Sequence, residues 1–72
     1  MKILIFRTDI KTKKKVRAVE PLFSKLSPVN RWSVDIEDID NVLRIETADS
    51  LNESDIIRLL NIYGFQCETL AD

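Results

Sequence analysis

The amino-acid sequence predicts an α+β protein: a ferredoxin-like βαββαβ sandwich, in which a four-stranded antiparallel sheet carries two helices on one face. Three observations predict this fold. Apolar residues recur at helical spacing in two segments. Apolar and polar residues alternate in a segment between them, which is typical of a half-buried strand. The elements follow one another in the order β-α-β-β-α-β, which right-handed crossovers turn into the ferredoxin-like sheet.

The first strand is expected over residues 2–8. One side of the strand carries Leu4, Phe6 and Thr8. The other side carries Ile3, Ile5 and Arg7. Because the Arg7 guanidinium requires water, the Leu4 side is expected to face the core.

The first helix is expected over residues 12–26, with Thr12 as its N-cap and Ser27-Pro28 as its stop. Its apolar residues recur at helical spacing: Val16, Val19, Leu22, Phe23 and Leu26. Pro21 lies inside this pattern and lacks a backbone N–H, so it is expected to kink or break the helix.

A hairpin is expected next, with strands over residues 31–37 and 42–48 joined by a turn at 38–41. In the first of these strands the apolar side carries Trp32, Val34 and Ile36. In the second, one side carries Leu43 and Ile45, and the other side carries Val42, Arg44 and Glu46. The carboxylates in this region are Asp35, Glu37, Asp38 and Asp40. Their spacing does not form an EF-hand loop, so turn formation is expected rather than Ca²⁺ binding.

The second helix is expected over residues 52–63, with an apolar face formed by Ile56, Leu59, Leu60 and Tyr63. Its capping pair is either Ser50 with Glu53 or Asn52 with Asp55. Gly64 is the natural left-handed residue after the helix. A last strand over residues 65–70 completes one domain, which spans residues 1–72.

Composition points to a cytoplasmic protein without membrane contact. No segment approaches the roughly 20 apolar residues that cross a bilayer. The first apolar run ends at Arg7 after four residues, too short for a signal peptide. The chain has one cysteine, which excludes an internal disulfide.

Charge is unevenly distributed along the chain. Residues 1–32 carry a net charge of +7 and residues 33–72 a net charge of −8. Such asymmetry occurs in nucleic-acid-binding proteins. The sequence nevertheless lacks the aromatic pattern of RNA-binding sheets, and its overall charge is −1, so nucleic acid is not the expected partner.

Between the first strand and the first helix the chain reads Ile10-Lys11-Thr12-Lys13-Lys14-Lys15, and the apolar residues Val16, Val19 and Leu22 follow three residues apart. This segment resembles the corresponding segment of heavy-metal-associated domains, the copper-chaperone and metal-pump modules. That family has the pattern Met-x-Cys-x-x-Cys followed by three apolar residues at the same spacing. The sequence Ile62-Tyr63-Gly64-Phe65 is similar to the family's Gly-aromatic ending of the second helix.

The resemblance lacks the family's two metal-binding cysteines, because Thr12 and Lys15 occupy their positions. Two thiolates suit a soft ion such as Cu(I). A threonine hydroxyl is a poor ligand for such an ion, and a lysine ammonium has no lone pair to donate. The family's copper chemistry therefore does not carry over, and no metal, cofactor or catalytic residue is expected at this loop.

The candidate site is instead a cationic loop that binds an acidic protein partner or a small anion, and its residues are Lys11, Thr12, Lys13, Lys14, Lys15 and Arg17. Helix N-termini disfavour cations, so the cluster lowers the stability of the free domain. An anionic ligand bound at the helix N-terminus would offset this cost. The alternative is a solvated charged surface, or pairing with the acidic half of the chain.

Two further surfaces are candidates for contacts. Cys67 is expected to be a small buried apolar residue; the alternative is an exposed thiol that binds metal weakly or joins two chains. The chain has no histidine, which excludes a histidine metal site. On the open sheet face, Ile3, Ile5 and Val42 predict a docking surface or a weak homodimer.

The expected function is thus a small binding or regulatory module, not an enzyme. One alternative is a residual metal-handling protein that uses Cys67 or carboxylates. A second is an acylphosphatase-like enzyme, which shares the chain order and needs an arginine and a phosphate-binding loop after the first strand. Arg7 and the lysines resemble that arrangement only faintly.

Overall fold

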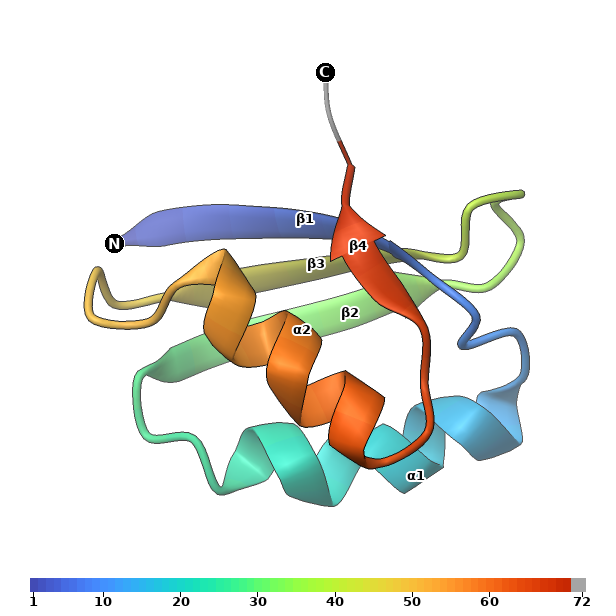
Figure 1. Ribbon diagram of the computed structural model, residues 1–72, viewed down its shortest axis with the longest axis horizontal. Helices are drawn as coiled ribbons and strands as arrows, with labels where there is room; N and C mark the ends of the chain where they lie inside the picture. Colours follow the sequence, from blue (N-terminus) through green and yellow to red (C-terminus); the bar gives the residue numbers. More distant parts are fainter. Residues whose placement is uncertain (71–72) are drawn as a thin grey trace.

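The computed structural model describes residues 1–70 and has the predicted ferredoxin-like fold (Figure 1). Its elements are β1 (Lys2–Thr8), α1 (Lys13–Ser24), β2 (Val29–Asp35), β3 (Val42–Thr47), α2 (Glu53–Ile62) and β4 (Cys67–Thr69). The sheet order is β2-β3-β1-β4, and every neighbouring pair is antiparallel. Within residues 1–70 no helix is long and apolar enough to cross a membrane.

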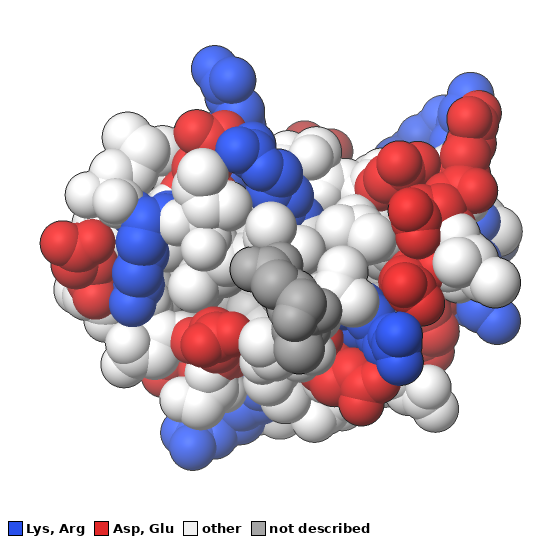
Figure 2. Space-filling view, turned by 90° about the horizontal axis from the view of Figure 1, so that it is seen from above, with Lys and Arg blue, Asp and Glu red and all other residues white. Residues whose placement is uncertain are grey.

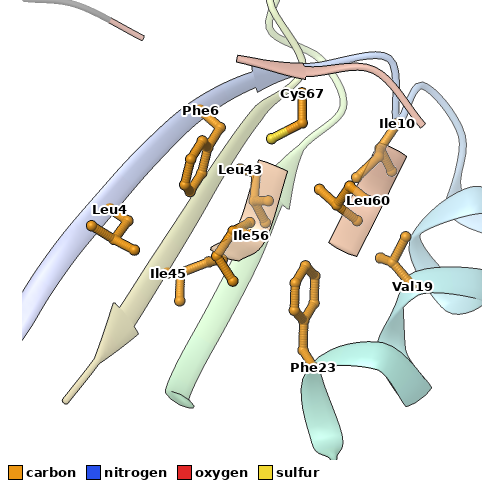
Figure 3. Close-up of a cluster of buried hydrophobic side chains, with 10 residues drawn as sticks. All are labelled: Leu4, Phe6, Ile10, Val19, Phe23, Leu43, Ile45, Ile56, Leu60 and Cys67. Carbon is orange, nitrogen blue, oxygen red and sulfur yellow. The ribbon is translucent and has the colours of Figure 1, made fainter. Parts of the chain in front are cut away.

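The core lies between one face of the sheet and both helices, as Figure 3 shows. The sheet contributes Leu4 and Phe6 from β1, Leu43 and Ile45 from β3, and Cys67 from β4; the helices contribute Val19, Phe23, Ile56 and Leu60; and Ile10 joins them from the loop after β1. The expected orientation of the first strand is therefore confirmed. Arg7 is exposed, because burying its charge without a partner would be costly.

The open face of the sheet carries Ile3, which is 48% exposed, and Ile5, which is half-buried. Arg44 of β3 lies opposite Ile5, and Glu46 lies opposite Ile3. Charged side chains therefore flank the two isoleucines, and the face is a mixed apolar and charged surface.

The predicted end of α1 needs correction, and one of the two effects expected of Pro21, a break, does not occur. The helix ends at Ser24 rather than at residue 26, because the Lys25 N–H bonds to the Phe23 carbonyl and the Leu26 N–H also bonds to it, at 3.0 Å. The helix also runs through Pro21 without a break. Pro21 is exposed, so water can reach the carbonyl group that its missing N–H leaves unbonded.

The hairpin turn begins earlier than predicted. Asp35 is the last residue of β2, because its carboxylate accepts the Glu37 N–H at 3.1 Å and its carbonyl accepts the Asp38 N–H at 3.3 Å. Ile36 therefore belongs to the turn. β3 ends at Thr47, one residue before the predicted end.

The second helix has Asn52 as its N-cap, which selects one of the two predicted pairs: the Asn52 N–H donates to the Asp55 carboxylate at 2.9 Å. Gly64 follows the helix with a φ of +87°, as its predicted left-handed role requires. β4 is three residues long, shorter than predicted. The reason is local: the Phe65 N–H closes the helix onto the Leu60 carbonyl at 2.9 Å, and Gln66 bonds to a loop instead of a strand.

Candidate functional site

The loop between β1 and α1 is fixed to the β2–β3 hairpin by Thr8. The Thr8 hydroxyl donates to the Asn41 carbonyl at 2.7 Å and accepts the Ile10 N–H at 3.2 Å. The Thr8 N–H also donates to the Asp40 carbonyl at 3.0 Å. One buried hydroxyl thus joins the end of β1, the hairpin and the start of the loop.

The opposite side of the loop is fixed to the segment before β4. The Gln66 N–H donates to the Asp9 carboxylate at 2.9 Å, and the Asp9 N–H donates to the Gln66 carbonyl at 3.4 Å. Neither this pair nor the Thr8 contacts were predicted from the sequence. The only sequence signal is the presence of two hydrogen-bonding side chains, Thr8 and Asp9, directly after a strand.

Ile10 anchors the middle of the loop in the core, where it is fully buried. Val19 is also fully buried, and Val16 and Leu22 pack against the core from partly exposed positions. The apolar positions that carry the family resemblance therefore do hold the loop and the helix against the sheet. Between these anchors, residues 11–15 are all exposed.

Thr12 and Lys15, which stand at the two cysteine positions of the resemblance, form the N-cap of α1. The Thr12 hydroxyl accepts the Lys15 backbone N–H at 3.1 Å. The Val16 N–H donates to the Thr12 carbonyl at 3.0 Å, which begins the helical ladder. The predicted N-cap is therefore present, and in it the Thr12 hydroxyl is the acceptor for a backbone N–H.

The cations of this loop point away from the core, and all five are exposed: Lys11, Lys13, Lys14, Lys15 and Arg17. Among the ion pairs within residues 1–70, none involves any of these five side chains. The carboxylates of residues 33–72 that form ion pairs do so with other cations: Arg7, Arg31, Arg44 and the N-terminal amine. The loop thus presents a cluster of cations without a compensating carboxylate in the described part of the chain.

The two halves of the chain do not form a positive and a negative half of the surface. β3, from the acidic half, lies between β2 and β1 in the sheet, so charges of both signs share each face. Figure 2 shows this mixture on the face seen from above. The cationic loop is a local feature and not one side of a dipolar molecule.

A depression of about 570 Å³ lies beside the loop, at the end of the sheet. Lys11, Asp9, Gln66 and Cys67 all contribute to its lining. Cys67 is buried at the start of β4, and burial, with smaller contributions from the Asp9 and Glu68 carboxylates, raises the pKa of its thiol to about 12. The thiol is therefore protonated at neutral pH, whereas metal binding requires the thiolate.

Two other candidate chemistries find little support in the geometry. Arg7 is held by Asp40 at 3.3 Å and by Glu68 at 3.4 Å, so its guanidinium is already paired instead of poised for phosphate. Within the described residues, no group of three or more cysteine, aspartate or glutamate side chains is arranged to hold a metal ion. The hairpin carboxylates of Asp35 and Asp38 each accept a backbone N–H, which is turn geometry.

Comparison of the sequence with protein-family models and with curated proteins finds no match. Solved structures do match. The yeast copper transporter domain CCC2A superposes with a TM-score of 0.82 and 15% identity, over 100% of this chain and 99% of that one. A copper-binding domain from HMA7, a P-type ATPase, superposes with a TM-score of 0.82 and 22% identity, over 99% and 96%. Oxidised MerP from Ralstonia metallidurans gives 0.80 and 11%, over 97% of each chain.

These structures share the whole length of the fold with this chain, at identities too low to carry function across. The expected ferredoxin-like architecture is confirmed, and it is the architecture of these copper-binding and MerP domains. The single cysteine, Cys67, lies on β4 and not on the loop where the family resemblance places its metal-binding pair. The protein therefore has the fold of the heavy-metal-associated domains, without their pair of cysteines.

Proposed function

We propose that this protein is a cytoplasmic binding module in which a cationic loop replaces the metal site and docks to an acidic surface on a protein partner. The observation that supports the proposal most strongly is the state of residues 11–17. Thr12 and Lys15 form a helix cap, and the surrounding cations are exposed and form no ion pair within the described chain.

Electrostatics supports an anionic ligand at this place. A helix N-terminus carries a partial positive charge, and its free N–H groups point toward the loop. Five cations add to that field. The arrangement is unfavourable for the isolated domain and favourable for a complex with carboxylates. Carboxylates on a protein partner suit it better than a nucleotide, because no glycine-rich phosphate loop is present.

The backbone of the loop is held in place by contacts with the rest of the domain. The Thr8 and Asp9 contacts hold both of its sides, and Ile10 holds its centre. A partner would therefore need to order the cationic side chains but little of the loop backbone.

The test is an NMR titration of the ¹⁵N-labelled protein with an oligoglutamate peptide. We expect chemical shift changes centred on residues 11–17 at low salt. They should weaken steeply with added salt, since the Debye length falls from about 10 Å at 0.1 M to about 3 Å at 1 M. A variant with Lys13→Gln, Lys14→Gln and Lys15→Gln should lose the response.

A charge-matched control separates a local site from general attraction. Lys2→Gln, Lys25→Gln and Arg58→Gln remove the same amount of charge at exposed or half-exposed positions outside the loop. This control should keep the response of residues 11–17. Equal weakening in both triple variants would contradict the proposal, because binding would then follow net charge alone.

A further inference from the structure

β2 forms an outer edge of the sheet and pairs only with β3. Apart from that ladder, its backbone makes two hydrogen bonds within residues 1–70, and both lie at its ends. The Val29 N–H donates to Leu26 at 2.9 Å, and the Asp35 carbonyl accepts from Asp38 at 3.3 Å. The groups between them that point outward form an unpaired row, which is a template for another strand.

The side chains of residues 31–35 are arranged symmetrically about Ser33. On the open face, Arg31 precedes Ser33 by two residues and Asp35 follows it by two, and all three are exposed. On the helix face, Trp32 and Val34 flank Ser33, and both are half-buried. A strand with opposite charges at equal distances from its centre is complementary to itself when turned antiparallel.

We propose that the β2 strands of two copies pair antiparallel about a two-fold axis at Ser33, joining the two sheets edge to edge. Arg31 then lies directly opposite the partner's Asp35, and Trp32 lies opposite the partner's Val34. Residues directly opposite in such a pair have Cβ atoms about 4.5–5.5 Å apart, close enough for each contact.

This register is specified by the side chains. Side chains alternate between the two faces of a strand. A slip of one residue would therefore pair positions of the helix face, such as Trp32, with positions of the charged open face. A slip of two residues would centre the pair on Trp32 or Val34, and Arg31 would no longer face the partner's Asp35. Only the axis at Ser33 makes both ion pairs.

Both charges are available for this contact. The Arg31 side chain is 80% exposed, and its nearest carboxylate, Glu46, is at 3.9 Å. Arg44 holds the same Glu46 at 3.2 Å. One oxygen of the Asp35 carboxylate accepts the Glu37 N–H at 3.1 Å, and the carboxylate forms no ion pair in the described part of the chain. Exposed ion pairs contribute little by themselves, so they select the register while the backbone bonds and apolar contacts hold the pair.

The apolar contact adds to the cover of Trp32. Its ring packs against Phe23 of α1 at a centroid distance of 4.9 Å, and the residue as a whole is half-buried. The partner's Val34 would cover part of the area that remains exposed. Since a cross-strand aromatic and β-branched pair stabilises a sheet, the two Trp32 contacts are the main apolar gain.

The pairing is limited to residues 31–35 and closes on itself. A register shift between Val29 and Arg31 disrupts the ladder at one end, and the turn at Asp35 ends the strand at the other. A two-fold contact uses the same edge in both copies, so it forms a dimer and not a fibre.

A disulfide trap tests the axis directly. In Ser33→Cys, the two introduced thiols would lie at directly opposite positions, where Cα atoms are about 4.5–5.5 Å apart, within the range that a disulfide spans. We expect rapid oxidation to a covalent dimer. The matched control is Ser54→Cys, at an exposed position on α2, which should stay monomeric. Buried Cys67 does not compete in either variant. Equal cross-linking of both variants would overturn the proposal.

A charge exchange tests the register without a covalent bond. Arg31→Asp and Asp35→Arg each place like charges opposite one another, so each variant alone should be monomeric in sedimentation velocity at concentrations where the wild type dimerises. Their mixture makes two opposite-charge pairs and should dimerise again. A wild-type protein that stays monomeric at millimolar concentration, or a dimer lost in Ile3→Lys/Ile5→Lys and retained in Arg31→Asp, would contradict it.

The proposal is independent of the cationic loop. The loop variant with three glutamines should dimerise as the wild type does, so failure of one proposal does not imply failure of the other.

Discussion

The Thr12 hydroxyl accepts a hydrogen bond from the Lys15 backbone N–H at 3.1 Å, so the two positions that would carry metal-binding thiols are joined by a helix cap. This contact stabilises the loop without any ligand. At the position where the family resemblance places a cysteine, Thr12 thus supplies the interaction that starts α1.

The cap predicts a stability difference between two small substitutions. Thr12→Ala should lower the free energy of unfolding by about 0.5–2 kcal/mol, because the Lys15 N–H loses its acceptor. Thr12→Ser keeps a hydroxyl and should cost much less. Urea denaturation followed by circular dichroism measures both. Equal losses in the two variants would show that the methyl group matters and the cap does not.

The lysines predict a gain in stability when they are neutralised. Each exposed cation in the first turn of a helix costs about 0.3–1 kcal/mol at low ionic strength. Lys13→Gln, Lys14→Gln and Lys15→Gln together should therefore raise the melting temperature slightly at low salt, and the gain should shrink at high salt. A clearly lower melting temperature at low salt would mean that the lysines pair with the acidic half of the chain in solution.

Introducing two cysteines at the loop should create soft-metal binding. Thr12→Cys with Lys15→Cys places two thiols on the exposed loop and first turn, where the helix N-terminus favours thiolates. We expect micromolar or tighter Cu(I) binding by this variant, measured by competition with a chromogenic chelator, and none by the wild type at the loop. Thr12→Cys alone is the control and should bind far more weakly.

Cys67 predicts a pH dependence at the alkaline end. Its thiol has a pKa raised from 9.0 to about 12 in the folded state, so the folded protein holds the proton more tightly than the unfolded chain. This contribution to stability is complete below pH 9 and is lost progressively between pH 9 and about 12. In Cys67→Ala, the free energy of unfolding should fall less steeply across that window. An unchanged slope would show that the thiol is already accessible to water.

Much of the fold follows from side-chain periodicity. The two sides of β1 and β3, and the buried residues of both helices, were predictable because burial on one face imposes a fixed spacing. Tyr63 is the exception: it was predicted on the apolar face of the second helix, but it is 59% exposed at the C-cap of α2. The ends of elements were less predictable. β2 ends at Asp35 because the Asp35 side chain accepts the Glu37 N–H and forms a turn. β4 does not include Gln66, because the Gln66 N–H bonds to Asp9, which lies 57 residues away in the sequence. No local pattern contains that second contact.

The candidate site was likewise predictable only in part. The cap by Thr12 could be read from its place before the helix, and the exposure of the lysines follows from their charge. The absence of ion pairs around them within residues 1–70 could not be predicted, because it depends on where the sheet order places the carboxylates. The complementarity of β2 with itself also required the structure, since it depends on β2 being an outer strand.

The most direct test of the account is one ¹⁵N-labelled wild-type sample titrated in parallel with Cu(I) and with an oligoglutamate peptide at low salt. The account predicts that the amide signals of residues 11–17 shift with the peptide and stay in place with Cu(I). Micromolar or tighter Cu(I) binding centred on residues 10–16, retained in Cys67→Ser, would contradict the claim that a cationic docking surface has replaced the metal site.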